Sequence, residues 1–331
     1  SKVIIKEENM KKSFKCISLM LSPLLILGCG STAFSAATVE DNKSVKAIYE
    51  KIEEGRTVLY DENNNEIPVE KLNNDTENIS KKLPQKYDLR DYGRVSKVKN
   101  QGSEGYCWAF ASVASMESSI LSQNDLKSKL GENPQDTIDL SEAGQTWYIH
   151  SGIVDKSSPF YGDYINDSSK GSNGGTSDTL AISLNSGFGT YLQSLCPYNE
   201  VKKGFSETLR YYSDYRLKDY SEISNNKDTL KSKIVSNGAV TVHYPSITDC
   251  YSYDYANYYS DNTCIGIGDS HLIVVVGWDD NYSKDNFTGK VKPSNDGAWL
   301  CKNSWGEHYG NDGYIWISYD TTNLAFSQYI M

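Results

Sequence analysis

The sequence has few of the residues and motifs that build metal sites and nucleic-acid surfaces. Its 331 residues include only four histidines, and neither C-x-x-C nor H-E-x-x-H occurs, so we expect no zinc-type metal site. Lysine and arginine total 33 against 43 aspartates and glutamates, which gives a net charge of −10. Because a nucleic-acid ligand requires a basic surface, this balance argues against nucleic acid as the main partner.

The N-terminal region has the pattern of an export signal. Met10 starts the basic stretch M-K-K-S-F-K, which is followed by apolar C-I-S-L-M-L-S-P-L-L-I-L and by small residues. This order predicts a signal peptide over residues 10–37, cleaved near Ala33–Ala37. The apolar stretch is short and contains Pro23, so we expect no permanent membrane span. Residues 1–9 precede this signal, and we expect translation to start at Met10.

Two features of the cysteines stay open at this stage. I-L-G-C-G-S-T around Cys29 also fits a lipoprotein signal, in which Cys29 would carry a lipid anchor. Both kinds of signal place the mature protein outside the cytoplasmic membrane. Signal removal leaves five cysteines, and an odd number in an exported protein requires at least one free thiol. Cys250 and Cys264 bracket a tyrosine-rich loop and either form a disulfide or stay reduced.

Composition divides the rest of the chain at about residue 83. Residues 38–82 are charged and rich in asparagine, and their one periodic piece, V-K-A-I-Y-E-K-I at 45–52, predicts about two helical turns. We expect this segment to be a pro-segment or a spacer. Aromatic and apolar residues recur from L-P-Q-K-Y-D-L-R onward, which places the main domain at 83–331.

The period of the apolar residues changes within this main domain. T-S-D-T-L-A-I-S-L-N at 176–185 predicts a helix with an N-cap at its first residues. Short β-branched or aromatic runs at 238–244, 271–278, 297–305 and 313–319 predict strands. A helical first part is therefore followed by an antiparallel, strand-rich second part, with a cleft expected between them.

One cysteine stands where a nucleophile would be activated. Cys107 lies in Q-G-S-E-G-Y-C-W-A-F, and apolar residues recur after it at Ala109, Val113, Met116 and Ile120. This spacing predicts a helix that starts at or near Cys107. The N-terminus of a helix favours the thiolate over the thiol. A buried structural cysteine is the alternative, and three further segments decide against it.

Those segments supply the other groups that a nucleophilic cysteine needs. His271 begins the apolar run H-L-I-V-V-V-G-W and could serve as a base. Asn303 lies in W-L-C-K-N-S-W-G, two residues before Trp305, and could orient that base. Gln101 stands six residues before Cys107, in a glycine-containing loop where its amide could donate to an oxyanion.

In the order Gln, Cys, His, Asn, these residues resemble the papain family of cysteine peptidases. L-P-Q-K-Y-D-L-R-D-Y-G-R-V-S-K-V-K-N-Q-G is similar to the start of a mature papain-like domain. L-S-E at 140–142, G-S-N-G-G at 171–175 and K-N-S-W-G are similar to further motifs of the family. The resemblance covers residues 83–318. The stretch between His271 and Asn303 is most similar to papain-like peptidases of clostridial cell surfaces, which implies a secreted or surface-attached protein of a Gram-positive-type bacterium.

The resemblance implies an α+β, two-lobe fold, in which a helical lobe and an antiparallel β-barrel-like lobe enclose the active-site cleft. It implies Cys107 as the nucleophile and His271 as base and then acid. Asn303 would hold the imidazole, and Trp305 would shield that hydrogen bond from water. The side chain of Gln101 and the backbone N–H of Cys107 would form the oxyanion hole.

The resemblance also implies the kind of ligand. Asn173, Gly174 and Gly175 would present their backbone to an extended peptide, as strand-like pairing requires. Protein or peptide substrates are therefore the expected partners, with no metal or organic cofactor. We expect the protein to be a monomer.

Several residues depart from the family's pattern or stand outside it. Glu104 and Ser172 occupy positions where the family often has a disulfide, and Tyr106 stands where a small residue is usual, which we expect to narrow the cleft. We expect Cys301 in the core. Of the remaining histidines, His243 could reach the cleft wall. We expect structural roles for the other two, in polar loops: His150 and His308.

The combined hypothesis is an exported cysteine endopeptidase, made as a zymogen, that works through an acyl-enzyme. Two alternatives belong to other classes. The first is a cell-surface binding protein that keeps the fold and no longer cleaves. The second is an acyl-transfer enzyme that uses the same triad.

Overall fold

The computed structural model describes residues 49–53, 56–60, 66–67, 83–153, 156–157, 161, 171–264 and 268–331. The chain divides into two compact units, Ser1–Glu77 and Asn78–Met331. The expected signal peptide at 10–37, the lipid-anchor candidate Cys29 and the cleavage region at 80–82 all lie outside the described residues. In the part that is described, no helix is both long and apolar enough to cross a membrane.

The described part of the first unit is a small antiparallel sheet of strands β1 (Tyr49–Glu53), β2 (Arg56–Tyr60) and β3 (Glu66–Ile67). The helix expected at 45–52 is therefore wrong over its described residues. The reason lies in the partner strand, because β2 pairs with β1 residue by residue from Tyr49–Tyr60 to Glu53–Arg56. These cross-strand hydrogen bonds outweigh a weak helical periodicity.

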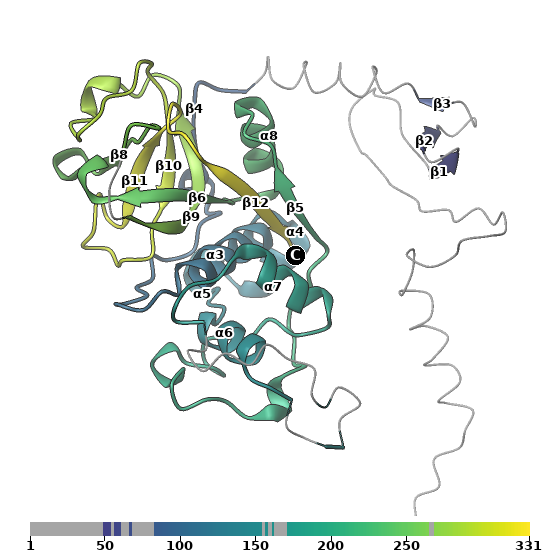
Figure 1. Cartoon of the computed structure of the whole chain (residues 1–331). Coiled ribbons are helices and arrows are strands. Elements are labelled where there is room, and N and C mark those ends of the chain that lie inside the picture. Colours follow the sequence, from purple (N-terminus) through teal and green to yellow (C-terminus); the bar gives the residue numbers. More distant parts are fainter. Residues whose placement is uncertain are drawn as a thin grey trace, which may run out of the picture. The chain divides into compact units, whose positions relative to one another are not determined.

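Helices make up one half of the second unit (Figure 1). The helix expected after the glycine-containing loop is confirmed as α3, and the one expected at 176–185 as α7, where the Thr176 hydroxyl accepts the N–H of Thr179 as an N-cap. The described α-helices are α3 (Cys107–Ser122), α4 (Asn124–Lys127), α5 (Pro134–Thr137), α6 (Glu142–His150), α7 (Ser177–Asn185) and α8 (Lys227–Asn237). Single 3₁₀ turns are η1 (Leu89–Tyr92), η2 (Ser128–Leu130), η3 (Tyr198–Glu200), η4 (Glu207–Leu209), η5 (Thr248–Cys250), η6 (Tyr253–Tyr255) and η7 (Lys284–Asn286).

The other half is a nine-stranded sheet in the order β5-β12-β6-β9-β10-β11-β8-β7, with β4 paired to β9 off this path. The strands are β4 (Lys86–Asp88), β5 (Asp219–Ile223), β6 (Val240–Ile247), β7 (Tyr251–Ser252), β8 (Asn257–Tyr258), β9 (Gly268–Asp279), β10 (Ala298–Lys302), β11 (Tyr314–Ser318) and β12 (Ala325–Ile330). Neighbouring strands run antiparallel except β11 and β8. The expected α+β fold, with helices and a mainly antiparallel sheet, is confirmed. The end strands β5 and β7 do not pair, so the sheet is open and does not close into a barrel.

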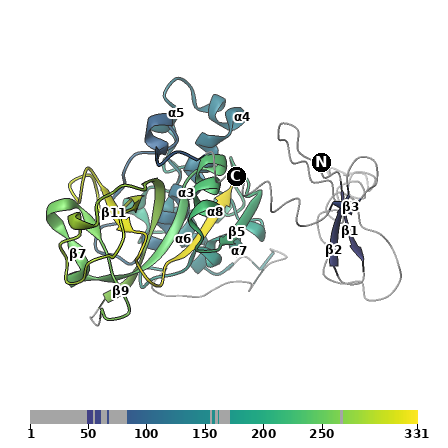
Figure 2. The same ribbon diagram turned by 90° about the horizontal axis from the view of Figure 1, so that it is seen from above.

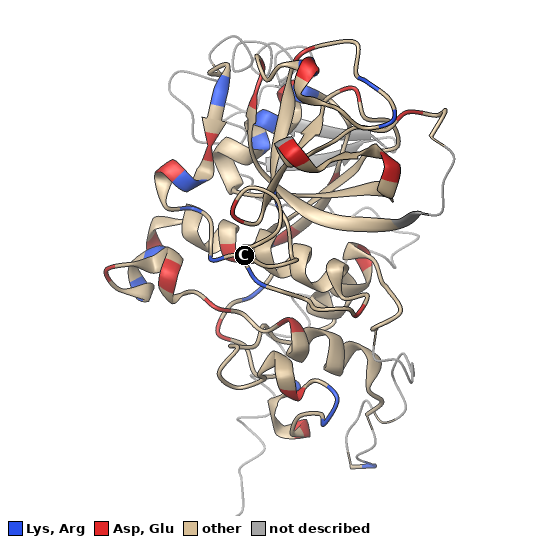
Figure 3. Ribbon diagram, turned by 90° about the vertical axis from the view of Figure 1, so that its left-hand side faces the viewer, with Lys and Arg blue, Asp and Glu red and all other residues tan. Residues whose placement is uncertain are grey.

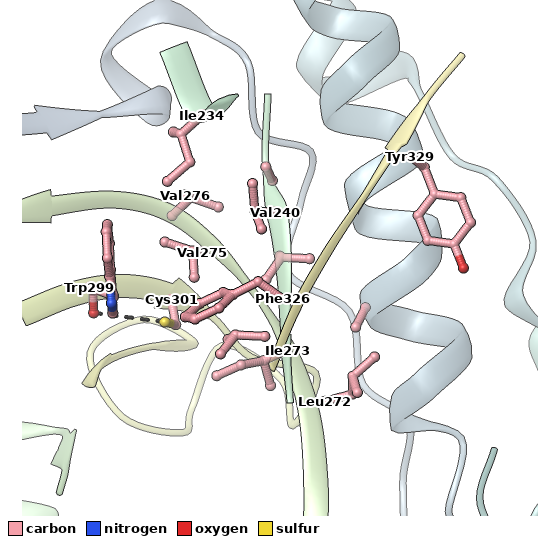
Figure 4. Close-up of a cluster of buried hydrophobic side chains, with 14 of the residues drawn as sticks. Ile234, Val240, Leu272, Ile273, Val275, Val276, Trp299, Cys301, Phe326 and Tyr329 are labelled. Carbon is pink, nitrogen blue, oxygen red and sulfur yellow. Dashed lines mark hydrogen bonds between the residues drawn. The ribbon is translucent and has the colours of Figure 1, made fainter. Parts of the chain in front are cut away.

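The core lies where α3 packs against β9 and β12. Figure 4 shows alternate side chains of β9, among them Ile273 and Val275, meeting Phe326 of β12 and Cys301 of β10. Cys301 is fully buried, which confirms its expected place in the core. In Figure 2 the same strand β12 runs from the sheet to the side of α3. This packing fixes the start of α3 relative to β9, and with it the two elements that carry the site.

A buried ion cluster joins the loop before α3 to α3 and α6. The ammonium of Lys99 lies 2.9 Å from a carboxylate oxygen of each of Glu117 on α3, Glu142 on α6 and Asp139. Glu117 and Glu142 are almost completely buried, whereas charged residues of both signs are otherwise mixed over the ribbon (Figure 3). Burial raises the pKa of the Glu142 carboxyl, and the Lys99 ammonium opposes that shift.

Candidate functional site

The candidate nucleophile is the first residue of a helix. Cys107 starts α3, so its sulfur lies at the positive end of the helix dipole. The loop before it is held close to a neighbouring loop, because the backbone N–H of Gly105 donates to the carbonyl of Ser172 at 2.7 Å. A Cβ atom at Gly105 would lie 2.6 Å from that carbonyl oxygen, so only glycine permits this approach.

The candidate base and its orienting residue lie on adjacent strands. His271 is on β9, and Asn303 follows the last residue of β10. The Nε2 atom of His271 lies 2.9 Å from Oδ1 of Asn303, which also accepts the backbone N–H of Ser304 at 2.8 Å. Because Oδ1 is an acceptor, Nε2 carries the proton in this bond, and Nδ1 remains as the basic nitrogen.

An indole ring covers the candidate base. Trp305 stacks on the imidazole of His271 with a centroid separation of 4.5 Å and an interplanar angle of 15°. His271 is 5% exposed, and this burial lowers its pKa to about 4, although the hydrogen bond that it donates to Asn303 opposes the shift. Without a charged neighbour, the His271 imidazole is therefore neutral at pH 7. Its protonated form, the imidazolium, requires a nearby negative charge such as a thiolate.

Gln101 is fixed in place by four hydrogen bonds. Its Nε2 donates to the carbonyl of Glu104 at 2.8 Å, and its Oε1 accepts the hydroxyl of Ser304 at 2.6 Å. Its backbone N–H donates to the carbonyl of Ser304, and its own carbonyl accepts the hydroxyl of Tyr198. Since the amide nitrogen has two hydrogens, one N–H remains to donate to a bound oxygen.

Sequence reasoning did not single out Ser304. It lies between Asn303 and Trp305 in K-N-S-W, a position that the sequence alone presents as an ordinary turn residue. In the structure its hydroxyl orients the Gln101 amide, and its backbone N–H shares the oxygen that holds His271. One residue therefore links the candidate oxyanion donor to the candidate base.

A single cleft brings most of the expected residues together. It has a volume of about 450 Å³ and is lined by residues of both halves, including Cys107, His271, Asn173, Gly174 and Gly175. Asn303 and Trp305 contact His271, and Ser304 connects Gln101 to Asn303 through its hydroxyl and its backbone N–H. The structure thus places all eight predicted site residues in one neighbourhood.

The glycine of the cleft wall has a packing role. A Cβ atom at Gly175 would lie 2.7 Å from the ring of Trp108, which is fully buried at the start of α3. Gly175 therefore brings the backbone of its loop against the helix that carries the nucleophile. This leaves the backbone of Asn173 and Gly174, both exposed, at the cleft surface.

Two expectations about neighbouring residues are wrong. Tyr106 does not narrow the cleft, because it is 2% exposed and packs with Phe110, edge-on to Tyr198. His150 does not lie in a polar loop; it ends α6, is buried, and its Nδ1 lies 2.9 Å from the carbonyl of Thr146. Helix α6 packs against α3 on this side. Its Ala143 lies in one buried cluster with Tyr106, and His150 is its last residue.

Two other open points are resolved in part. His243 does line the cleft, and burial lowers its pKa.

Cys250 and Cys264 are free thiols with their sulfur atoms 3.0 Å apart. Among the described residues no group of three or more His, Cys, Asp or Glu is placed to hold a metal ion.

Contacts replace the disulfide that the sequence lacks. At the two positions in question, the carboxylate of Glu104 pairs with Lys202 at 2.8 Å, and the carbonyl of Ser172 accepts the N–H of Gly105. The pair with Lys202 is exposed and contributes little. The backbone hydrogen bond and the glycine packing are what hold these loops together.

Comparisons with known proteins support the motifs. The family model "Papain family cysteine protease" matches residues 83–329. Procathepsin L of Rattus norvegicus is 26% identical over 244 residues, which is 73% of this chain and 62% of the relative. Cathepsin S of Mus musculus is 28% identical over 250 residues, which is 73% of this chain and 60% of the relative. The chain thus spans about three fifths of the length of the curated relatives it matches.

Solved structures agree with this match. The cysteine protease and lectin-like domains of Cwp84, a surface layer associated protein of Clostridium difficile, superpose with a TM-score of 0.61 at 30% identity, covering 76% of this chain and 52% of that one. The bromelain protease of Ananas comosus superposes with a TM-score of 0.53 at 22% identity, covering 75% of this chain and 100% of that one. The second likeness concerns the fold alone.

Proposed function

Because the chain belongs to the papain family of cysteine proteases, as its motifs predicted, we propose that it is an endopeptidase that works through a thioester on Cys107. The cleft shared by Cys107 and His271 carries this proposal. The Nε2–H of the His271 imidazole donates a hydrogen bond to Asn303, and this leaves Nδ1 to exchange a proton with the Cys107 thiol.

Acylation begins with transfer of the Cys107 proton to Nδ1 of His271. The thiolate attacks the peptide carbonyl, and the developing oxyanion accepts hydrogen bonds from the remaining N–H of Gln101 and the backbone N–H of Cys107. The imidazolium then protonates the leaving amine, and the carbon–nitrogen bond breaks. The burial that lowers the His271 pKa drives this proton onto the amine.

Deacylation reverses the direction of proton transfer. His271, neutral again, takes a proton from a water molecule, and the resulting hydroxide attacks the thioester carbonyl. The imidazolium returns its proton to the sulfur as the carboxylic acid leaves. Asn303 and Trp305 hold the ring in one orientation through both steps, since one binds its edge and the other covers its face.

The substrate is an extended peptide. The exposed backbone of Asn173, Gly174 and Gly175 offers N–H and C=O groups along the cleft, and an extended chain can pair with these as an added strand. Peptides and unfolded or loop segments of proteins fit such a wall.

The segment before the main domain is proposed to inhibit it. Residues 38–82 are polar and tethered directly to the domain, so an inhibitory sequence within them would act at the high effective concentration of an intramolecular ligand. Removal near Ser80–Leu83 would release the active form. Equal initial rates of the 38–331 and 83–331 proteins on one small peptide would show that the segment is only a spacer.

The site of action is proposed to be outside the cytoplasmic membrane. The signal pattern at 10–37 supports export, with Cys29 as an alternative lipid anchor. The matched Cwp84 is described as surface layer associated, which supports a surface or secreted location here. Mass spectrometry of the mature N-terminus separates the two modes, since lipidation leaves a modified Cys29 as the first residue.

The test of the mechanism uses three variants and one control. Cys107→Ala should lose peptide turnover and labelling by a thiol-directed epoxide, and His271→Ala should be nearly as severe. Asn303→Ala should be milder, because its side chain orients the ring and transfers no proton. Cys264→Ser, a half-buried thiol outside the cleft, should keep both activities. Turnover that survives Cys107→Ala would refute the mechanism.

A further inference from the structure

A small buried cavity lies beside Asn303, separate from the cleft that holds the nucleophile. It has a volume of about 10 Å³ for a water-sized sphere and is lined by residues of the loop before α3, of α3, α6 and β9, and of the end of β10. Its polar lining includes the side chains of Glu142, Lys302 and Asn303, each less than 5% exposed. The inference below rests on the proposed function, because Asn303 is the residue that holds His271 there.

Two polar atoms of these lining residues have no hydrogen-bond partner within the described part of the chain. They are Oε2 of Glu142 and Nδ2 of Asn303, and both are buried. The other carboxylate oxygen of Glu142 accepts the ammonium of Lys99 at 2.9 Å, and Oδ1 of Asn303 binds His271. Because a buried polar atom without a partner is costly, both atoms require a ligand that fits this cavity.

The lining selects the chemistry of that ligand. Nδ2 of Asn303 can only donate a hydrogen bond, and Oε2 of an ionised Glu142 can only accept one. The ammonium of Lys302 donates to Ser96 at 3.0 Å and has further hydrogens to donate. A cation would face the donors and an anion would face the carboxylate, whereas water both accepts and donates. The volume is about that of one water molecule, and buried waters typically form about three hydrogen bonds.

The Asn303 amide cannot satisfy Nδ2 by turning over. Its Oδ1 accepts the backbone N–H of Ser304 at 2.8 Å as well as Nε2–H of His271. Exchange of the two ends would set an amide donor against the Ser304 N–H, and would favour His271 with its proton on Nδ1. A ring in that form cannot take the Cys107 proton at Nδ1. The orientation of the Asn303 amide therefore decides whether the base is in the reactive form.

We propose that this cavity holds one bound water molecule, which accepts a hydrogen bond from Nδ2 of Asn303 and donates one to Oε2 of Glu142. The water stabilises the reactive orientation of the amide, and through it the Nε2–H form of His271. Glu142 is then a positioning residue for the reaction, because it acts on His271 through the water and Asn303. The buried cluster around Lys99 contributes to the chemistry in this way as well as to the packing.

A crystal structure of the Cys107→Ala protein tests the water directly. At a resolution that shows ordered water, a density peak should lie about 2.7–3.2 Å from both Nδ2 of Asn303 and Oε2 of Glu142. A cavity without density would overturn the inference. It would leave the proposed function intact, since the proposed reaction steps do not involve this cavity.

Two variants of nearly equal shape separate hydrogen bonding from packing. Ala111 of α3 is buried and lines the cavity. Ala111→Val should expel the water with a methyl group, whereas Ala111→Thr supplies a hydroxyl that can accept from Asn303 and donate to Glu142. We expect kcat to fall about tenfold in Ala111→Val, with little change in KM, and clearly less in Ala111→Thr. Equal losses, or no loss in either variant, would overturn the inference.

A second pair of variants assigns the effect to Glu142. Nitrogen NMR of the imidazole reports which ring nitrogen of His271 carries the proton, and the chain has only four histidines. In the Cys107→Ala background, Glu142→Met should convert the Nε2–H form into a mixture of the two forms, and in the active enzyme it should lower kcat about tenfold. Asp139→Leu removes another carboxylate from the same Lys99 ammonium, does not line the cavity, and should change neither quantity.

The outcomes separate the inference from the proposed function. An unchanged His271 proton position and an unchanged kcat in Glu142→Met would overturn the positioning role while the peptidase stands. Absence of turnover in the unsubstituted protein, together with absence of epoxide labelling at Cys107, would overturn the proposed function. In that case the density in the cavity would still decide whether the water is bound.

Discussion

Removal of the Lys99 ammonium should destabilise the protein far more than removal of an exposed one. Lys99 is the centre of the buried cluster, 2.9 Å from oxygens of Glu117 and Glu142, which are 0% and 1% exposed. Lys99→Met keeps the apolar stem and deletes the charge. The two carboxylates are then left in a desolvated site without their nearest counter-charge.

The magnitude follows from that burial. Removing one partner of a buried ion pair costs about 3–5 kcal/mol, because an uncompensated charge remains. The cost should also depend on pH. Burial already raises the pKa of Glu142, and loss of Lys99 raises it further, above its value in the unfolded chain. Such a group stabilises the fold when protonated and loses that contribution as pH rises, so the variant should be weakest above neutral pH.

Urea unfolding followed by tryptophan fluorescence measures this, in a Cys107→Ala background that prevents self-digestion. The variant should lose about 3–5 kcal/mol at pH 8 and distinctly less at pH 5. Adding Glu142→Gln should recover part of the loss. Lys203→Met, which breaks a pair in which the lysine side chain is 73% exposed, is the control and should show almost none. Equal losses for the two lysine variants, or no dependence on pH, would refute the electrostatic account.

Three further changes test other parts of the structure. Gln101→Ala should lower kcat by about 10²–10³-fold with little change in KM, and a loss confined to KM would contradict its role as oxyanion donor. Gly175→Ala should lower both Tm and kcat/KM, because the added methyl would meet the Trp108 ring at 2.7 Å; an unchanged Tm would count against that packing. Oxidised glutathione should convert Cys250 and Cys264 into a disulfide, lowering the mass by about 2 Da and stabilising the fold by about 3 kcal/mol, whereas thiols that stay free under these conditions would contradict the proximity of their sulfurs.

The local parts of the fold could be predicted from the sequence. The start of α3 at Cys107 and the cap of α7 at Thr176 follow from apolar spacing and from the side chain that accepts the first free N–H. The strand at 49–53 could not be predicted, because it depends on its pairing with β2. The open edges of the large sheet could not be predicted either. The period of the apolar residues shows which face of a strand is buried, but not which strands lie next to each other.

Some residues of the candidate site could likewise be predicted from the sequence and others could not. Gln101 and His271 were found because the family's motifs surround them. Ser304 was not assigned a role, since its function depends on contacts across the fold.

The position of β12 has a consequence for the order in which the enzyme becomes active during its synthesis. This strand, Ala325–Ile330, is the last of the described strands to leave the ribosome, yet it pairs with both β5 and β6 and supports α3. A nascent chain that already contains Cys107 and His271 but not this strand lacks the pairing that joins β5 to β6 and the packing against α3. Peptidase activity should therefore appear only after β12 has been synthesised and has joined the sheet.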